Sequence, residues 1–289
     1  MPISARIIAH SISSETGIPL ATLEVTIPRI ILPEISKHRV FSLSTESSRA
    51  RPFSITISEV EERPFVPEFW GAAVPGMNGD APLSEGKEKA AAFIWREAAL
   101  DAASRARQLF EAGVCKGLVN RLIEPFLFSR LVISSTKWAN FFALRLGENV
   151  EPHMRATARA IEEALLASVP KPLSPGEWHL PTIDETDPAT QLLSLSERQL
   201  LSAGRIARVS YGCFSASDEI RVSIARGKTL EYARPMHAVP FEHIATPDAE
   251  RRGFAALAGR WKNEREHGNF HGWRQLRKQL QGHETAEAV

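Results

Sequence analysis

Two β-branched segments near the N-terminus constrain the fold of this chain most strongly. Residues 3–13 and 19–28 each contain several β-branched apolar residues, which in places alternate with polar residues and in places are consecutive. A Gly-Ile-Pro turn at 17–19 separates the two segments. Such a pair predicts a β-hairpin. Because proline is tolerated in the first turn of a helix, Pro28 predicts a short helix immediately after the hairpin.

Most of the remaining chain has helical spacing. Apolar residues recur every three or four positions over residues 84–112, and Ser84 and Gly113 are suited to the two ends of a helix. Further helices are predicted at 115–124, 137–146 and 151–167, from a capping box at 196–199 through 210, and at 217–234, 248–263 and 268–282. These elements predict an α+β fold, in which a small antiparallel sheet packs with many helices.

Proline and glycine mark the irregular parts of the chain. Residues 52–83 are rich in both and are predicted to form an irregular insertion, while the prolines within residues 170–175 mark a connector. No internal repeat is visible, so residues 1–283 are predicted to form a single domain. Residues 284–289 are predicted to be a disordered tail.

Composition excludes several classes of function. The net charge of the 289 residues is only +1, which argues against a general surface for nucleic acid or membrane. No apolar run approaches the roughly 20 residues that span a bilayer, and the first residues lack a signal-peptide pattern. Cys115 and Cys213 show no pairing pattern and are predicted to pack rather than to act as nucleophiles. A cytoplasmic protein is expected.

The strongest functional pattern is the basic, hydroxyl-rich run at residues 37–49. Three adjacent cationic or titratable residues are followed by hydroxyls and a further arginine, namely Lys37, His38, Arg39, Ser42, Ser44, Thr45, Ser47, Ser48 and Arg49. Cations and short hydroxyls can hold a phosphate and the polar edge of a heterocycle. A solvated basic turn is the alternative explanation.

The spacing of this run resembles a family motif. Lys37-His38-Arg39, seven further residues, Ser47 and then Arg49 resemble the Arg-His-Arg-x7-Ser motif of the flavin-dependent thymidylate synthases. Residues 120–125 and 138–145 resemble that family's nucleotide-binding helices. Two further family motifs are resembled by Ala-Arg-Val-Ser at 207–210 and His-Ala-Val-Pro-Phe-Glu-His at 237–243.

The order of these motifs differs from that in ordinary family members, where the last two come first. We therefore predict a circular permutation, which folded domains tolerate because their termini lie at the surface and are often close together. The same order occurs in phage-encoded relatives, so a phage origin is expected, and with it a location in the host cytoplasm.

The resemblance implies a set of substrate and cofactor contacts. Arg145 would face the pyrimidine and favour its ionisation at N3, which makes it the predicted catalytic residue. The substrate-binding residues would be Glu34, Ser47, Ser48, Arg49, Arg121 and Arg145. The residues at the FAD would be Lys37, His38, Arg39, Thr45, Ser134, Thr136, Asn140, Ser210, His237 and Val239.

Some of these residues have simpler explanations. An internal ion pair with Glu124 would account for Arg121, and His237 would more often be a structural histidine. His237 and His243 could be two ligands of a metal ion, but no third ligand stands at a usable spacing, so no metal site is predicted.

Several positions depart from the family pattern. Lys37 replaces the first Arg and lacks its planar fork, Thr45 stands where relatives have Glu, and Glu34 stands where they have Gln. Val239 replaces a hydroxyl residue, and residues 151–153 replace a Gln-x-Glu stretch. These differences bear on the substrate and on the folate chemistry.

The resemblance implies transfer of a one-carbon unit from methylenetetrahydrofolate to C5 of dUMP, forming dTMP, with FAD as cofactor and NADPH as reductant. Relatives are homotetramers with active sites between subunits, and the same is expected here. Two alternatives stay open. One is a flavin- and folate-dependent pyrimidine nucleotide hydroxymethylase for phage DNA modification, motivated by Thr45 and Val239. The other is an inactive homologue that binds nucleotide or flavin.

Overall fold

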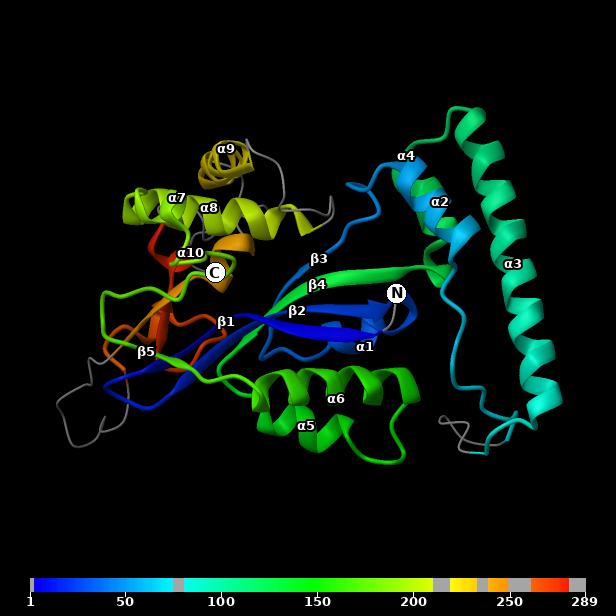
Figure 1. The fold of residues 1–289 in the computed structure, drawn as a ribbon, viewed down its shortest axis with the longest axis horizontal. Coiled ribbons are helices and arrows are strands. Elements are labelled where there is room, and N and C mark those ends of the chain that lie inside the picture. The colour runs from blue at the N-terminus through cyan, green and yellow to red at the C-terminus, as the bar shows by residue number, and fades with distance from the viewer. Residues whose placement is uncertain (1–2, 75–80, 210–218, 233–238, 249–260, 281–289) are drawn as a thin grey trace, which may run out of the picture.

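A five-stranded sheet with the strand order β3-β4-β2-β1-β5 forms the centre of the molecule, and β6 and β7 form a second small sheet (Figure 1). The computed structural model describes residues 3–74, 81–209, 219–232, 239–248 and 261–280. The strands are β1 Ser4–Ser13, β2 Pro19–Pro28, β3 Ser42–Thr45, β4 Phe128–Ser135, β5 Lys171–Leu173, β6 Ala245–Pro247 and β7 Trp273–Gln275.

Helices surround the sheet on both faces. The α-helices are α1 Leu32–Ser36, α2 Phe53–Glu62, α3 Glu85–Glu111, α4 Lys116–Leu122, α5 Ala139–Arg145, α6 Pro152–Leu166, α7 Pro188–Gln191, α8 Leu195–Ala207, α9 Glu219–Glu231 and α10 Leu276–Gln279. Short 3-10 helices are η1 Arg29–Ile31, η2 Glu124–Phe126, η5 Val239–His243 and η7 Glu264–Glu266. Within the described ranges, no helix is long and apolar enough to cross a membrane.

The predicted N-terminal hairpin is confirmed. Strands β1 and β2 pair in antiparallel fashion from Ser4 opposite Thr26 to Ile12 opposite Pro19, with an irregularity at Ile8. Strand β4 lies antiparallel to both β2 and β3, whereas β5 lies parallel to β1. The α+β class is therefore confirmed, and the sheet is mixed rather than purely antiparallel.

The two faces of the sheet carry different side chains because successive residues of a strand point to opposite sides. Leu23, Val25 and Ile27 of β2 are fully buried and pack with residues of α5 and α6. Each such aliphatic side chain contributes about 1.5–3 kcal/mol when it is fully buried. The opposite face carries polar residues such as Thr22, and α8 and η5 lie over it (Figure 1).

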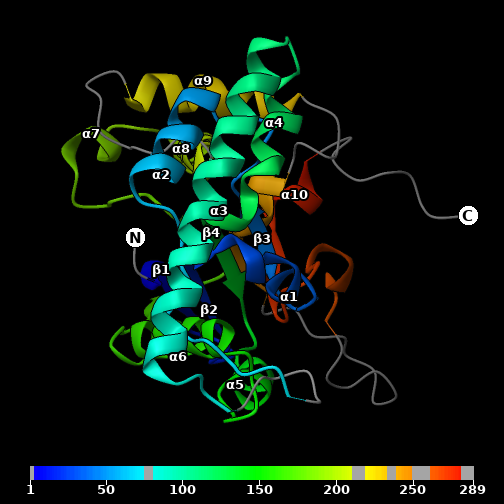
Figure 2. The same cartoon turned by 90° about the vertical axis from the view of Figure 1, so that its right-hand side faces the viewer.

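Helices α2, α3 and α4 form a separate unit beside the sheet (Figure 2). Ala99, Ala103 and Ala106 of α3 are buried against Ile57 and other residues of α2 and α4, and their small side chains allow close approach. Gly113, with φ of +86°, follows α3 and ends it as predicted.

Four sequence predictions need correction. The insertion at 52–83 is irregular only in part, because Phe53–Glu62 is helical: Pro52 precedes this helix, and the other prolines and the glycines come after it. The connector at 170–175 contains β5. The capping box of α8 uses Ser194 with Glu197, two residues earlier than predicted. Residues 268–282 do not form one helix, because Gly268 and Gly272 have positive φ and β7 precedes α10.

Two predictions fall largely beyond the described ranges. Most of the helix expected at 248–263 lies outside them, and residues 261–263 are not helical. The predicted tail at 284–289 also lies outside the described residues.

Candidate functional site

A cavity of about 590 Å³ lies where β3 and the turn after it meet the ends of α8, α9 and η5. We call it the β3 cavity. Its lining consists of Leu43, Ser44, Thr45, Ser47, Arg49, Ala50, Ile206, Ala207, Val209, Arg226, Leu230, Val239 and Pro240. The volume falls in the range of about 300–1,000 Å³ that small-molecule sites occupy.

The β3 cavity brings together two parts of the chain that the sequence analysis had selected separately. Thr45, Ser47 and Arg49 come from the basic, hydroxyl-rich run, whereas Val209 and Val239 come from the two C-terminal motifs. Long-range folding therefore joins these motifs around one space.

The turn after β3 is held by buried ion pairs. The backbone N–H groups of Ala50 and Arg51 both donate to the carbonyl of Ser47, at 2.9 and 3.1 Å. Arg51 is buried and pairs with Glu59 at 2.6 Å and with Glu46 at 3.5 Å. These contacts fix the backbone from which Arg49 projects.

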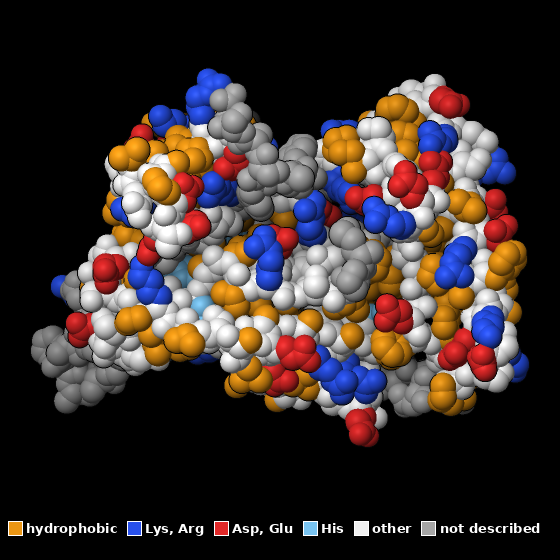
Figure 3. Space-filling view, in the orientation of Figure 1, with side chains coloured by type: hydrophobic (Ala, Val, Ile, Leu, Met, Phe, Trp, Pro, Cys, Tyr) orange, Lys and Arg blue, Asp and Glu red, His pale blue; other side chains and the backbone are white. Residues whose placement is uncertain are grey.

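The β3 cavity favours an anionic ligand. Arg49 and Arg226 line it, and none of the described residues in its lining is an Asp or a Glu. Arg49 packs against α4, where a Cβ on Gly117 would lie 3.1 Å from the Arg49 Cγ. Since Arg121 follows Gly117 by four residues, it shares that face of α4. Figure 3 shows Lys and Arg side chains gathered around the hollow between the α8–α9 and α2–α4 ends of the molecule.

Ser48 faces away from this cavity. Its hydroxyl contacts the carboxylate of Glu124, which also pairs with Arg29 at 3.0 Å. Arg29 also donates to Ser48 Oγ at 3.0 Å. The structure thus gives Glu124 a different partner from Arg121, and it places Ser48 in an ionic cluster between η1 and η2.

Arg145 lies on the other face of the sheet. Its Nε donates to Nε2 of His38 at 2.9 Å, and His38 packs edge-on against Phe141. Burial, and secondarily the charge of Arg145, lower the pKa of His38 below its usual value. Lys37 and Arg39, which flank His38, are exposed. A single chain therefore does not bring Arg145 to the β3 cavity.

The other predicted residues are spread over the fold. Ser134 is fully buried and contacts Thr22 and His243, whereas the hydroxyl of Thr136 accepts the N–H of His271 at 3.0 Å. Asn140 is exposed in the first turn of α5. Glu34 is half-buried, and its Oε2 has no hydrogen-bond partner among the described residues. Ser210 and His237 lie outside the described residues.

Sequence reasoning assigned two polar residues of the cavity to neither substrate nor cofactor. Ser44 was named only as one of the short hydroxyl donors of the basic, hydroxyl-rich run. Arg226 sits on α9, a predicted helix, and no motif in its surroundings indicated a ligand contact.

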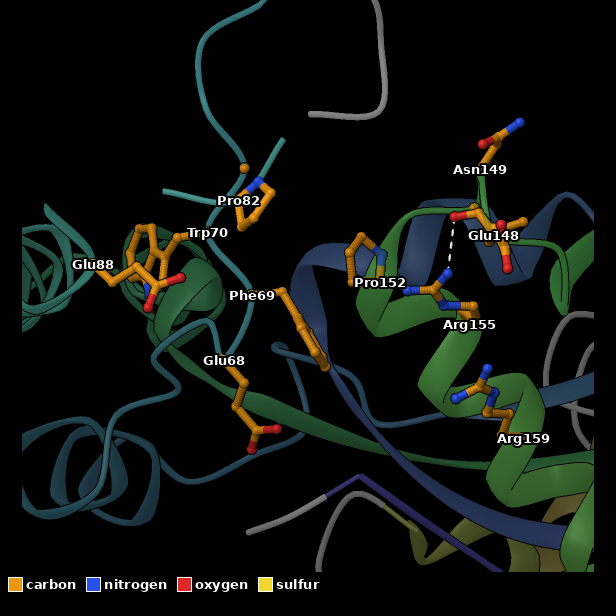
Figure 4. Close-up of a pocket in the computed structure, with 12 residues that line it drawn as sticks. Glu68, Phe69, Trp70, Pro82, Glu88, Glu148, Asn149, Pro152, Arg155 and Arg159 are labelled. Atoms are coloured by element: carbon orange, nitrogen blue, oxygen red, sulfur yellow. Dashed lines mark hydrogen bonds between the residues drawn. The ribbon is translucent and has the colours of Figure 1, made fainter. Parts of the chain in front are cut away.

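A second cavity of about 590 Å³ lies between residues 68–71, Pro82 and the start of α6 (Figure 4). Arg155 and Arg159 point into it, and Arg155 donates to the carbonyl of Glu148 at 2.8 Å. Its lining also contains the carboxylates of Glu68, Glu88 and Glu148 and no residue predicted for the site. It is therefore less suited to an anion than the β3 cavity. Among the described residues, no group of three or more His, Cys, Asp or Glu could hold a metal ion.

An α+β fold with a cationic, hydroxyl-lined cavity of this size is typical of proteins whose cavity suits a small anionic ligand. The family model for the thymidylate synthase complementing protein matches residues 3–171, and the chain belongs to that family. It is accordingly an enzyme of the flavin-dependent thymidylate synthase type. The match runs from β1 to β5, so the segments of α8, α9 and η5 that line the β3 cavity lie beyond it.

Several solved structures are similar to this chain over about half its length. The UMP/dUMP methylase PolB from Streptomyces cacaoi bound with 5-Br UMP has 16% identity and a TM-score of 0.46, over 57% of this chain and 88% of that chain. The same enzyme with 5-Br dUMP has 15% identity and a TM-score of 0.47, over 57% and 90%. ThyX from Helicobacter pylori, complexed with FAD and dUMP, has 21% identity and a TM-score of 0.34, over 50% and 67%. No curated protein sequence matches the chain.

Proposed function

We propose that this enzyme transfers a one-carbon unit from methylenetetrahydrofolate to C5 of dUMP and forms dTMP, with FAD as cofactor and NADPH as reductant. The observation that carries the proposal is the β3 cavity, where the basic, hydroxyl-rich run meets the two C-terminal motifs. Cytoplasmic location, that of the host if the chain is phage-encoded, is part of the same proposal.

The donor set of the β3 cavity fits a phosphate-bearing ligand. Arg49 and Arg226 would neutralise phosphate, and the hydroxyls of Thr45 and Ser47 would add short donors without further charge. Arg121, on the α4 face next to Arg49, would extend this cationic wall. Bound FAD would supply the redox step, while these side chains bind and orient the nucleotide.

Arg145 is available for a ligand. Its Nε is bound to His38, and its two Nη groups have no hydrogen-bond partner in the described part of the chain. An arginine stays protonated at all relevant pH values, so it would stabilise the negative charge that develops on a pyrimidine ring. None of the described residues that line the β3 cavity is a cysteine, and the proposed reaction needs no enzyme nucleophile.

Helix α5, which ends at Arg145, lies on the opposite face of the sheet from α8 and α9, which carry part of the lining of the β3 cavity (Figure 1). This arrangement supports active sites between subunits. A second copy of the chain would bring its own Arg145, together with its exposed Lys37 and Arg39, to the cavity. A homotetramer, as in relatives, would provide such interfaces.

The β3 cavity also supports the circular permutation. Its C-terminal walls lie outside the family match, yet they meet the β3 wall as the family motifs would if only their order in the chain had changed. On this basis we propose a single permuted domain over residues 1–283.

One observation favours a second candidate function. Thr45 and Val239, two of the positions that depart from the family pattern, both line the β3 cavity. Compared with the family pattern, Thr45 removes a carboxylate and Val239 removes a hydroxyl from the cavity. These changes would alter how a one-carbon unit is held, so a pyrimidine nucleotide hydroxymethylase is the alternative.

The test is to incubate the protein with FAD, NADPH and methylenetetrahydrofolate, and with dUMP or dCMP in turn. Mass analysis of the nucleotide should show a methyl group on dUMP, together with tritium release from C5-labelled dUMP. A hydroxymethyl product would replace the proposal with the alternative. A colourless protein that never takes up FAD would contradict both and indicate an inactive homologue.

A further inference from the structure

A buried series of hydrogen bonds runs across the polar face of the sheet and ends at the β3 cavity. It links six side chains, which we call the polar chain: Ser11, His179, Thr22, Ser134, His243 and Ser44. The links are Ser11 Oγ to His179 Nδ1 at 2.8 Å, His179 Nε2 to Thr22 Oγ1 at 2.8 Å, Thr22 Oγ1 to Ser134 Oγ at 2.6 Å, Ser134 Oγ to His243 Nδ1 at 2.8 Å and His243 Nε2 to Ser44 Oγ at 3.0 Å.

Strand register places the four hydroxyls on one face. Thr22 of β2 is directly opposite Ser134 of β4, so their side chains are neighbours. Ser11 is two residues from the partner of Thr22, and Ser44 is two residues from the partner of Ser134. Because side chains alternate along a strand, all four point to the same side. His179 and His243 bridge the gaps from above that face.

Both imidazoles are neutral at neutral pH. Burial lowers the pKa of His179 to about 3, with smaller effects from His10 and His243, and burial alone lowers the pKa of His243 to about 3. A neutral imidazole has one N–H donor and one bare nitrogen acceptor, and a hydroxyl has one hydrogen to donate. Each member of the polar chain therefore brings one hydrogen, and the five links use all but one of them.

The sixth hydrogen must be donated by one of the four hydroxyls to an acceptor outside the polar chain, because both nitrogens of each imidazole already take part in links. Thr22 and Ser134 are fully buried and have no further acceptor among the described residues. Ser11 likewise has none there, and only 5% of it is exposed. Ser44 lines the β3 cavity, where a ligand can accept its hydrogen. A buried hydroxyl without an acceptor is costly, so the free hydrogen belongs at Ser44.

We infer that Ser44 donates a hydrogen bond to an oxygen acceptor of the ligand in the β3 cavity. The polar chain, which begins at Ser11 on β1, fixes the direction of this hydrogen bond. Every donor then points from Ser11 towards the cavity, and both imidazoles carry their hydrogen on Nε2. A ligand that presents only an N–H group at Ser44 would leave the Ser44 hydrogen without an acceptor unless all five links reversed. Ser44 is thus a specificity-determining residue that selects a carbonyl or phosphoryl oxygen.

The direction of the polar chain is measured on the wild-type protein without ligand, by ¹⁵N NMR of histidine-labelled protein. His179 and His243 should each show a protonated Nε2 and a bare Nδ1. Either imidazole with its hydrogen on Nδ1, or with both nitrogens protonated at pH 7, would overturn the inference. This result does not depend on the proposed function.

The ligand contact rests on the proposed function and is tested separately, with FAD alone and dUMP alone as probes. The Ser44→Ala variant should bind one of the two about 3- to 20-fold more weakly than wild type, and the probe that loses affinity identifies the ligand whose oxygen meets Ser44. The Ser58→Ala variant, which removes an exposed serine of α2, should bind both as wild type does.

Unchanged affinity of Ser44→Ala for both probes would overturn the ligand contact. If wild type binds neither probe, the proposed function fails, and the NMR result still decides the direction of the polar chain.

Discussion

Arg145 and His38 form a cation–imidazole contact that a pH measurement can detect. Arg145 donates to Nε2 of His38 and lowers the pKa of that imidazole, in addition to the larger effect of burial. Replacing Arg145 by Ala should therefore raise the pKa of His38, which NMR titration would show. An unchanged pKa would mean that the contact is absent in solution.

The same Arg145→Ala variant tests catalysis. Turnover should fall at least about 100-fold while FAD stays bound, because the proposed partner of Arg145 is the pyrimidine rather than the flavin. Steady-state kinetics and the flavin absorbance provide the two measurements. Arg105→Ala, which removes an exposed arginine of α3, is the matched control and should keep full turnover. Retained turnover in Arg145→Ala would remove its catalytic role.

Arg49 gives a second test at this scale. Since Arg49 lines the β3 cavity with no carboxylate beside it in the described lining, Arg49→Ala should weaken dUMP binding by about 10- to 100-fold, as expected for the loss of hydrogen bonds from a charged donor. Calorimetry of nucleotide binding measures the change, again with Arg105→Ala as the control. Equal affinities in the two variants would place the nucleotide elsewhere.

Sequence could predict some site residues because chemistry and spacing identified them directly. Thr45, Ser47, Arg49 and Val239 were selected from motifs, and the fold brings them to one cavity. Ser48 was misplaced because residue type does not reveal which neighbour a hydroxyl meets, and here that neighbour is Glu124. The pairing of Arg29 with Glu124 depends on the contact of η1 with η2, which no local pattern encodes.

At the scale of elements, the crossing of α8 and α9 depends on two glycines. A Cβ on Gly204 would collide with the carbonyl oxygen of Ser223, and one on Gly227 would collide with that of Leu200. Backbone atoms cannot move aside cheaply, so Gly204→Ala or Gly227→Ala should lower the free energy of unfolding by about 1–3 kcal/mol. Because α8 and α9 form a wall of the β3 cavity, ligand affinity should fall as well.

Chemical unfolding measures this effect, and α3 offers a control. No atom lies within 4 Å of a Cβ built on Gly86, so Gly86→Ala should leave stability unchanged or raise it by up to about 1 kcal/mol. Equal stabilities of Gly204→Ala and Gly86→Ala would show that the two helices do not cross so closely.

Helices and strands were predicted correctly where a local sequence pattern determines them. They were not predicted where the element depends on pairing with strands that are distant in sequence. The β1–β2 hairpin and α3 have strong periodicity and clear boundaries, and both are confirmed. Strands β3 and β4 were not predicted, because each is stabilised by neighbours that are distant in sequence. Helix α2 was hidden by the Pro- and Gly-rich residues that follow it.

At the scale of the whole molecule, acid should destabilise the fold through the polar chain. His179 and His243 have pKa values of about 3 in the folded state, against about 6.5 when unfolded. Between these values the unfolded chain binds more protons, so the free energy of unfolding falls as pH decreases from about 6.5, by up to about 1.4 kcal/mol per pH unit for each histidine. Above pH 6.5 their contribution is fully present and constant.

Urea unfolding at pH 7.5, 6 and 5 measures this dependence. His10 and His38, whose pKa values are also lowered, act in the same direction, so a His179→Gln variant is needed for comparison. That variant should be less stable at pH 7.5 but should show a shallower loss of stability towards pH 5. Parallel curves for wild type and variant would mean that His179 is not buried as a neutral group.

The indole N–H of Trp273 donates to the carbonyl of Ile18 at 3.2 Å, which ties the turn of the first hairpin to the last small strand. These residues are 255 positions apart, almost the full length of the chain. During synthesis the hairpin leaves the ribosome first, yet the cluster that covers its apolar end at Leu20 and Ile18 is complete only when Phe270 and Trp273 have been made. A nascent chain of this enzyme therefore keeps part of this apolar surface exposed until translation is nearly complete. Premature termination would yield an aggregation-prone product.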